Sequence, residues 1–181
     1  MTKALKAVIR TIPDFPKPGI AFKDVTTVFQ DPALARRCVD QILAEFPVSS
    51  FDVVGGIEAR GLILGTLIAH DSERPFFPFR KPGKLPWKTL RESYRLEYGE
   101  NALEMHVDAV GEGQRVLIVD DLLATGGTAA AATRLVRRAG AEMTGIAFLV
   151  ELGYLDGRAP LLAEGLTAQQ IRSLIIFGEG E

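Results

Sequence analysis

Two adjacent carboxylates followed by a turn rich in threonine and glycine form the part of the sequence best suited to chemistry. Asp120 and Asp121 close a hydrophobic run. The turn after them leads into an alanine-rich stretch and consists of Ala124, Thr125, Gly126, Gly127 and Thr128. If that stretch is a helix, free backbone N–H groups and two hydroxyls converge on its positive end, which predicts an anion site.

The two carboxylates narrow the kind of anion expected there. Carboxylates repel a bare phosphate and need hydroxyls or a cation as partners, and a sugar phosphate supplies both an anion and hydroxyls. The turn has no lysine after its glycines and lacks the spaced glycines of dinucleotide-binding folds, which excludes those two nucleotide sites. The alternative is an ordinary strand-to-helix turn capped by Thr128, with no ligand.

Apolar strands alternate with helical stretches along the chain, which predicts an α/β fold. The strand-like runs are residues 51–57, 115–120 and 146–150. Helical stretches follow the first two, over residues 61–70 and up to about residue 138. This alternation is typical of a twisted, largely parallel sheet with helices on both faces. Ligands of such sheets bind at the carboxyl ends of the strands, where Asp120 and Asp121 are expected.

An arm and a helix are predicted before the first strand. Residues 1–30 form the arm, and the prolines within residues 13–19 make part of it rigid and irregular. Asp31 and Pro32 suit an N-cap and a first helical residue, so a helix is expected from there to about Phe46.

A hairpin is predicted between the two strand–helix units. Residues 93–98 and 102–108 alternate in polarity on either side of Gly99 and Glu100, as the strands of an antiparallel hairpin do. Inserted at that point, the hairpin would be flexible and project beyond the sheet, where mobile connections often carry functional groups.

Composition limits the number of domains, the partners and the location. The chain has 181 residues, of which 47% are hydrophobic and 24% charged, so we expect a single domain over residues 1–181. A net charge of −2 gives no broad positive field for a nucleic acid. No apolar run approaches the roughly 20 residues of a membrane span, and the first residues lack a signal-peptide core. We therefore expect a cytoplasmic protein that binds neither nucleic acid nor membrane.

Three other reactive side chains have structural interpretations. Cys38 is the only cysteine and lies at helical spacing from Leu34 and Ile42, so it is expected in the core. His70 closes a helix and His106 lies on the polar side of a strand. Neither histidine belongs to a cluster with the spacing of metal ligands.

Five segments resemble, in the same order, those of the type I phosphoribosyltransferases. They are residues 15–24, 58–61, 80–86, 93–99 and 119–128. The last, VDDLLATGGT, resembles the adenine-specific members in particular. The resemblance runs from about Ile12 to Leu152 and implies the fold of that family. It also implies purine salvage, in which adenine and 5-phosphoribosyl 1-diphosphate give AMP and pyrophosphate, with Mg²⁺ held mainly by the substrate and a homodimeric enzyme.

On the sugar side, the resemblance assigns the diphosphate-sugar loop to residues 120, 121 and 124–128. Arg60 follows the first strand at the same sheet edge, and a planar guanidinium suits a bidentate grip on pyrophosphate. The resemblance brings Lys81 and Lys84 to the same group. An isolated arginine or a basic cluster of this kind is otherwise often a solvated surface feature.

On the base side, the resemblance makes Ala21, Phe22 and Lys23 one wall of the adenine pocket, with Leu122 opposite. Main-chain groups can accept from the amino group of adenine and donate to the adjacent ring nitrogen, whereas a 6-oxo purine presents the reverse polarity.

The resemblance places two further residues at the tip of the predicted hairpin, which closes over the substrates. Glu97 is expected to reach the purine and to transfer a proton at its imidazole edge. Tyr98 is expected beside the diphosphate sugar. Glu97, Arg60, Asp120 and Asp121 are therefore the candidate catalytic residues.

Two other functions remain open. A phosphoribosyltransferase for guanine or xanthine would share the sugar loop and differ in the base segment. A transcription regulator with this fold would sense a purine or a diphosphate sugar, but it would usually add a DNA-binding domain, for which the roughly 30 residues before the first core helix are too few. The sequence departs from the family beyond Gly153, before a last strand expected at residues 174–177.

Overall fold

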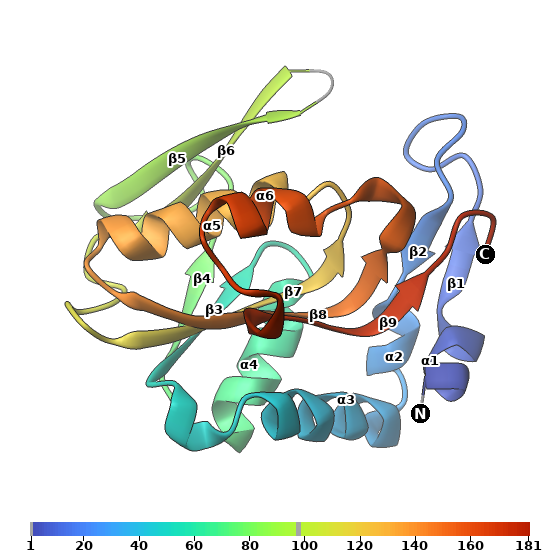
Figure 1. The fold of residues 1–181 in the computed structure, drawn as a ribbon, viewed down its shortest axis with the longest axis horizontal. Helices are drawn as coiled ribbons and strands as arrows, with labels where there is room; N and C mark the ends of the chain where they lie inside the picture. Colours follow the sequence, from blue (N-terminus) through green and yellow to red (C-terminus); the bar gives the residue numbers. More distant parts are fainter. Residues whose placement is uncertain (1, 97–98) are drawn as a thin grey trace.

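A five-stranded parallel sheet forms the centre of the structure, a computed structural model that describes residues 2–96 and 99–181 (Figure 1). In spatial order the strands are β4 (Phe76–Phe79), β3 (Val53–Ile57), β7 (Arg115–Leu123), β8 (Glu142–Leu152) and β9 (Ile171–Phe177). Each neighbouring pair is parallel. The predicted α/β fold is confirmed.

Helices cover both faces of the sheet. Below it in Figure 1 lie α3 (Pro32–Glu45) and α4 (Gly61–Asp71), and above it lie α5 (Gly127–Arg138) and α6 (Arg158–Ala163). Neighbouring residues of β7 pack on opposite faces of the sheet. Leu117 belongs to the apolar cluster that contains residues of α3 and α4, and Ile118 belongs to the cluster that contains residues of α5. Burial on both faces explains why the central strands are almost continuously apolar.

The beginning of α3 follows the prediction. The Asp31 carboxylate accepts hydrogen bonds from the backbone N–H groups of Ala33, at 2.9 Å, and Leu34, at 3.2 Å, and Pro32 opens the helix. Cys38 is fully buried in this helix, as predicted, and burial raises the pKa of its thiol to about 11.

The N-terminal arm has more regular structure than predicted. It contains α1 (Thr2–Val8), β1 (Arg10–Ile12), β2 (Phe22–Asp24) and α2 (Thr26–Phe29). The two strands pair antiparallel as a small separate sheet. Leu5 and Ile9 are buried in the core, which attaches the arm to the lower layer.

The predicted hairpin is present and begins earlier than expected. Strand β5 (Thr89–Leu96) pairs antiparallel with β6 (Gly99–His106), with Thr89 opposite His106 at its base. Figure 1 shows the hairpin projecting beyond the sheet on the α5 side. Leu103 and Met105 bury themselves in the same apolar cluster as α5, so the base of the hairpin is a packed part of the fold.

Short segments complete the chain. Three 3-10 helices are η1 (Val48–Ser50), η2 (Gly153–Leu155) and η3 (Ala168–Gln170). Among the described residues, no helix has the length and apolar character needed to cross a membrane.

Candidate functional site

The site lies where the order of strands reverses. From β3 the chain continues outward to β4, whereas from β7 it continues in the opposite direction to β8 and β9. The connections therefore diverge between β3 and β7, which leaves a crevice at the carboxyl ends of these two strands. Arg60 follows β3, and Asp120 and Asp121 lie near the end of β7. Topology thus brings these three side chains together.

Asp120 and Asp121 are buried neighbours with different partners. The backbone N–H of Asp121 donates to Oδ1 of Asp120 at 2.8 Å. Burial, together with the adjacent carboxylate of Asp121, raises the pKa of Asp120 well above its ordinary value. The pair therefore offers carboxylate oxygens side by side, at a place where burial makes ionisation of Asp120 costly.

Arg60 provides the cation opposite these carboxylates. Its Nε donates to Oδ2 of Asp121 at 2.5 Å, and its side chain is 32% exposed. The next residue must be small, because a Cβ on Gly61 would lie 2.7 Å from Oδ1 of Asp120. Gly61 therefore allows α4 to begin directly against β7.

The turn after β7 is a compact backbone cradle at the start of α5. Gly126 has a left-handed backbone, with φ 79°, and a Cβ there would lie 2.1 Å from the carbonyl oxygen of Gly157. A Cβ on Gly157 would in turn lie 2.1 Å from the carbonyl oxygen of Ala124. Two glycines in different segments thus set the shape of the cradle.

The cradle and Arg60 enclose one cavity of about 210 Å³. Its lining consists of Arg60, Asp120, Asp121, Leu122, Leu123, Ala124, Thr125, Gly126, Gly127, Thr128 and Ala129. The first turn of a helix has backbone N–H groups without helical partners, and those of α5 begin here. Backbone N–H groups that can bind an anion, two carboxylates and a guanidinium therefore line the same cavity. A charged sugar phosphate requires this combination of groups.

The predicted base segment reaches the site through Phe22. The ring centroid of Phe22 lies 5.0 Å from Cζ of Arg60, in cation–π contact. Leu122 lines the cavity on the β7 side, and Ala21 is exposed. The side chain of Lys23 points elsewhere, because it is buried against Thr11 and the ring of Phe177. Only the main chain of Lys23 remains available to a base.

Lys81 and Lys84 are exposed and do not line the cavity. Two glutamates that the sequence analysis did not single out hold their loop. Glu58 Oε2 accepts from Nε of Arg80 at 2.8 Å and from the backbone N–H of Lys81 at 2.9 Å. Burial raises the pKa of Glu58, but these hydrogen bonds and nearby positive charges outweigh it, so the pKa lies below its ordinary value.

The second glutamate, Glu104, is buried on β6, and its Oε2 accepts from the backbone N–H of Gly83 at 3.1 Å. Glu58 precedes Arg60 by one intervening residue, so the basic loop is tied directly to the Arg60 segment. Glu58 could have been found from the sequence, because it belongs to the segment 58–61 that resembles the family. No local sequence pattern pointed to Glu104.

Glu97 and Tyr98 lie outside the described residues. Within residues 2–96 and 99–181, no group of three or more histidine, cysteine, aspartate or glutamate side chains is placed to hold a metal ion.

Comparisons with known proteins show the family. Residues 25–164 match the model of the phosphoribosyl transferase domain. The chain is 51% identical over 173 residues to the adenine phosphoribosyltransferase of Chelativorans sp. (strain BNC1), which spans 96% of this chain and 94% of the relative. It is 53% identical over 169 residues to that of Jannaschia sp. (strain CCS1), over 93% of this chain and 94% of the relative.

Solved structures share the fold. The adenine phosphoribosyltransferase of Rhodothermus marinus superposes with a TM-score of 0.89 at 49% identity, covering 97% of this chain and 98% of the other. That of Saccharomyces cerevisiae, complexed with an imino-altritol bisphosphate and adenine, superposes with a TM-score of 0.83 at 34% identity, covering 98% and 97%.

Proposed function

The chain belongs to the phosphoribosyl transferase family and acts in it as an adenine phosphoribosyltransferase, and we propose how its residues divide the work. The reaction joins adenine to the ribose of 5-phosphoribosyl 1-diphosphate and releases pyrophosphate. The observation that carries the assignment of roles is the single cavity that contains Arg60, both aspartates and the backbone cradle.

The cradle binds the 5-phosphate of the sugar. Thr125, Gly126, Gly127 and Thr128 offer backbone N–H groups, two hydroxyls and the positive end of α5. Asp120 and Asp121 then accept from ribose hydroxyls, and Asp121 also orients Arg60. A phosphate in the cradle would leave the ribose beside the two aspartates.

Arg60 grips the leaving pyrophosphate, with Lys81 and Lys84 at the rim of the site. A guanidinium held by Asp121 in a partly buried position offers directional donors to the pyrophosphate oxygens. Glu58 and Glu104 accept hydrogen bonds from the backbone of the loop that carries both lysines. This anchoring supports the arrangement, because it holds the loop next to the Arg60 segment.

Adenine lies between Phe22 and Leu122, and the main chain of Ala21 and Lys23 reads its amino group and adjacent ring nitrogen. An oxo-purine would leave these main-chain groups unpaired, which is a costly mismatch in a desolvated pocket. The ring of Phe22 also contacts Arg60, so the base and diphosphate subsites share a wall.

Catalysis follows from where charge develops. As pyrophosphate leaves, C1 of the ribose becomes positively charged and the purine nitrogen attacks it, so the two partners must be held in line. The aspartates stabilise that positive charge, Arg60 stabilises the negative charge on the leaving group, and Glu97 exchanges a proton with the imidazole edge of the base. Mg²⁺ would be held mainly by the oxygens of the diphosphate substrate, and when bound it would supply positive charge that offsets the negative charge of the leaving pyrophosphate.

The decisive experiment measures pyrophosphate release from 5-phosphoribosyl 1-diphosphate and Mg²⁺ with adenine, hypoxanthine, guanine or xanthine. We expect turnover with adenine alone. Glu97→Ala should lower kcat by about a hundredfold, as loss of a general acid–base group does. The matched control, Glu142→Gln on an exposed strand residue, should leave kcat unchanged. Turnover only with an oxo-purine would contradict the base pocket, and no turnover with any base would favour a sensor.

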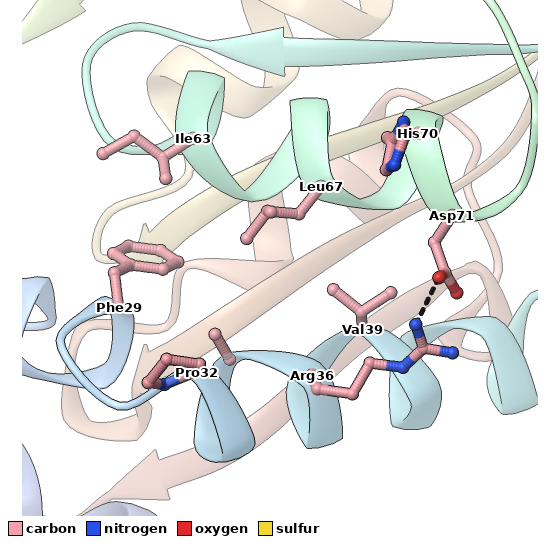
Figure 2. Close-up of a pocket in the computed structure, with 9 residues that line it drawn as sticks. Phe29, Pro32, Arg36, Val39, Ile63, Leu67, His70 and Asp71 are labelled. Atoms are coloured by element: carbon pink, nitrogen blue, oxygen red, sulfur yellow. Dashed lines mark hydrogen bonds and ion pairs between the residues drawn. The ribbon is translucent and has the colours of Figure 1, made fainter.

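A homodimer is part of the same proposal. An apolar groove of about 420 Å³ lies between α3 and α4. In Figure 2, Ile63 and Leu67 of α4 lie on one side of it, and Phe29, Pro32 and Val39 lie on the other. Ile63 is 45% exposed and Leu67 37% exposed. A second copy would bury these side chains, and contiguous exposed apolar surface of this kind favours an interface.

Light scattering at several protein concentrations tests the dimer. Leu67→Glu should shift the mass toward the monomer. Leu162→Glu, a matched change at an exposed leucine of α6, should leave it unchanged. A monomeric wild type would contradict the dimer. We also propose a cytoplasmic location, because the single cysteine, Cys38, cannot form an internal disulfide, and fractionation of the native cells would test it.

A further inference from the structure

Neighbouring side chains of β2 point to opposite sides, as a strand requires. Phe22 faces the catalytic crevice, where its ring contacts Arg60. Lys23 faces away, toward the segment that follows β9, and its Nζ lies 4.4 Å from the ring centroid of Phe177. The strand that carries the base segment is therefore held from behind by residues near the C-terminal end of the chain.

The contacts of Lys23 are those of a buried anchor. Its side chain is among the most buried of the large residues, at 2% exposure. Nζ donates to Oγ1 of Thr11 at 2.8 Å and to the main-chain oxygen of Glu181. Burial lowers the pKa of Lys23, although the charge of Glu181 opposes this effect. A buried ammonium without such partners would be strongly destabilising, so these contacts restrict where β2 can lie.

The receiving side of this contact is fixed independently of Lys23. The carboxylate of Glu181 accepts from Nζ of Lys6 at 2.7 and 2.9 Å and from the backbone N–H of Gly178 at 2.6 Å. Phe177 ends β9, which is paired with β8 in the central sheet. A continuous set of contacts therefore runs from the central sheet through Phe177 and Glu181 to Lys23.

This anchoring matters because β1 and β2 form a sheet separate from the central one. In the described part of the chain, β2 is therefore not held in place by hydrogen bonds to a strand of the central sheet. Apolar packing of Leu5 and Ile9 attaches the arm as a whole. Within the base segment, Phe22 contacts Arg60 at the crevice, and Lys23 makes the contact on the opposite side of β2.

We propose that Lys23 is a positioning residue for adenine, which fixes the main chain of residues 21–23 against the base through Phe177 and Glu181. The inference rests on the proposed function, and it deepens it by assigning residues 177–181 to the support of the base pocket. Lys23 does not bind the base with its side chain. It acts on adenine through the placement of β2.

The test separates the two substrates. In Lys23→Met, which keeps the length of the side chain, we expect KM for adenine to rise about tenfold, as displacement of a binding group does, while kcat and KM for the diphosphate sugar stay within about twofold. Lys23→Arg should restore much of the adenine affinity, because it keeps the charge and a donor. Lys88→Met, at an exposed lysine, is the matched control and should behave as wild type.

A second variant tests whether the effect passes through Phe177. It also keeps the proposal testable if Lys23→Met folds poorly. Phe177→Leu removes the ring beneath Nζ and should also raise KM for adenine. The double variant should be no worse than the more affected single variant, because coupled residues are not additive. An unchanged KM for adenine in both single variants, additive effects, or equal rises in both KM values with a matching loss of melting temperature would overturn the inference. A wild type that does not use adenine would overturn the proposed function itself.

Discussion

Nε of Arg60 donates to Oδ2 of Asp121 at 2.5 Å across 61 positions of the sequence, and this ion pair joins the segment after β3 to β7, at the point where the strand order reverses. Asp121 is 7% exposed at its side chain, whereas Arg60 keeps 32% of its surface. The carboxylate is therefore a fixed support, and the guanidinium is the partner that can turn part of its donor set toward a ligand.

The first prediction concerns the shape of this cation. Arg60→Lys keeps the charge but loses the planar donor set, so kcat/KM for the diphosphate sugar should fall by about a hundredfold, since a lysine cannot reproduce bidentate recognition. Arg172→Lys is the matched control, because Arg172 forms an ion pair on the surface with Glu45. Steady-state kinetics decide the matter, and equal effects of the two substitutions would contradict the role of Arg60.

The second prediction follows from the raised pKa of Asp120. The folded protein holds a proton on this carboxyl at pH values where the unfolded chain has released it, so the free energy of unfolding decreases as pH rises from near the ordinary value of 3.8 through the raised pKa. Asp120→Asn removes that decrease. Denaturant titrations over a series of pH values should show wild type losing stability relative to Asp120→Asn as pH rises.

Two controls accompany this titration. Asp40→Asn, at an exposed residue of α3, should follow wild type at every pH. Activity of Asp120→Asn should fall by about a hundredfold, because the amide, unlike the carboxyl, cannot lose a proton and carry negative charge when positive charge develops at the ribose. Parallel stability curves for wild type and Asp120→Asn would show that burial does not perturb this carboxyl.

The third prediction tests the support beneath the cradle. Gly157→Ala places a methyl group 2.1 Å from the carbonyl oxygen of Ala124, in a backbone with φ −62° that alanine otherwise adopts freely. The crowding should cost about 1–3 kcal/mol of stability and raise KM for the diphosphate sugar about tenfold, because the cradle must shift.

Gly111→Ala provides the comparison for this substitution. Its new methyl group would meet Oε1 of Gln114 at 3.5 Å, which is ordinary contact. Thermal melts and substrate titration of both variants are sufficient. If Gly157→Ala loses stability but keeps its KM, the contact supports the fold and not the cradle.

The fourth prediction concerns the attachment of the hairpin. Arg134 on α5 donates from Nε to Glu92 at 2.7 Å and from a terminal nitrogen to Glu164 at 2.5 Å, so it links β5 to the segment after α6. We expect the hairpin to close over the substrates, so Arg134→Met, which would confine it less, should lower kcat about fivefold. The same substitution should increase hydrogen exchange over the described strands β5 and β6.

Arg137→Met is the control for the hairpin. It removes a neighbouring arginine of α5 that is more exposed and bonds the main-chain oxygen of Glu164. We expect its kcat to match wild type within about twofold. Unchanged hydrogen exchange in Arg134→Met would mean that apolar packing of the hairpin alone sets its position.

The sequence predicted most successfully where the relevant residues are contiguous. The strand, carboxylates, turn and helix from residue 115 to 138 form one local unit, so period, turn chemistry and residue type all indicated the same structure. Edges were harder to predict. Strand β4 was not predicted. It contains Pro78, and the structure places this strand on the edge of the sheet, where a missing N–H is tolerated.

Relationships between distant segments could not be predicted from the local pattern. The sequence around Phe22 does not predict its contact with Arg60, and the sequence around Gly157 does not predict its close approach to Ala124. Lys23 was grouped with the base pocket through the resemblance, whereas the direction of its side chain depends on which face β2 turns toward β9. Such facts are set by tertiary packing and not by propensity.

The burial of Cys38 also makes the molecule convenient to label. The only thiol of the chain has no exposed surface and remains protonated at neutral pH, since its pKa is raised to about 11. Maleimide dyes and spin labels react with accessible thiolates and therefore leave the native protein unmodified. A cysteine introduced on the hairpin and another on the arm would accept a pair of probes without removal of the native residue, so that the distance between these segments could be followed during turnover.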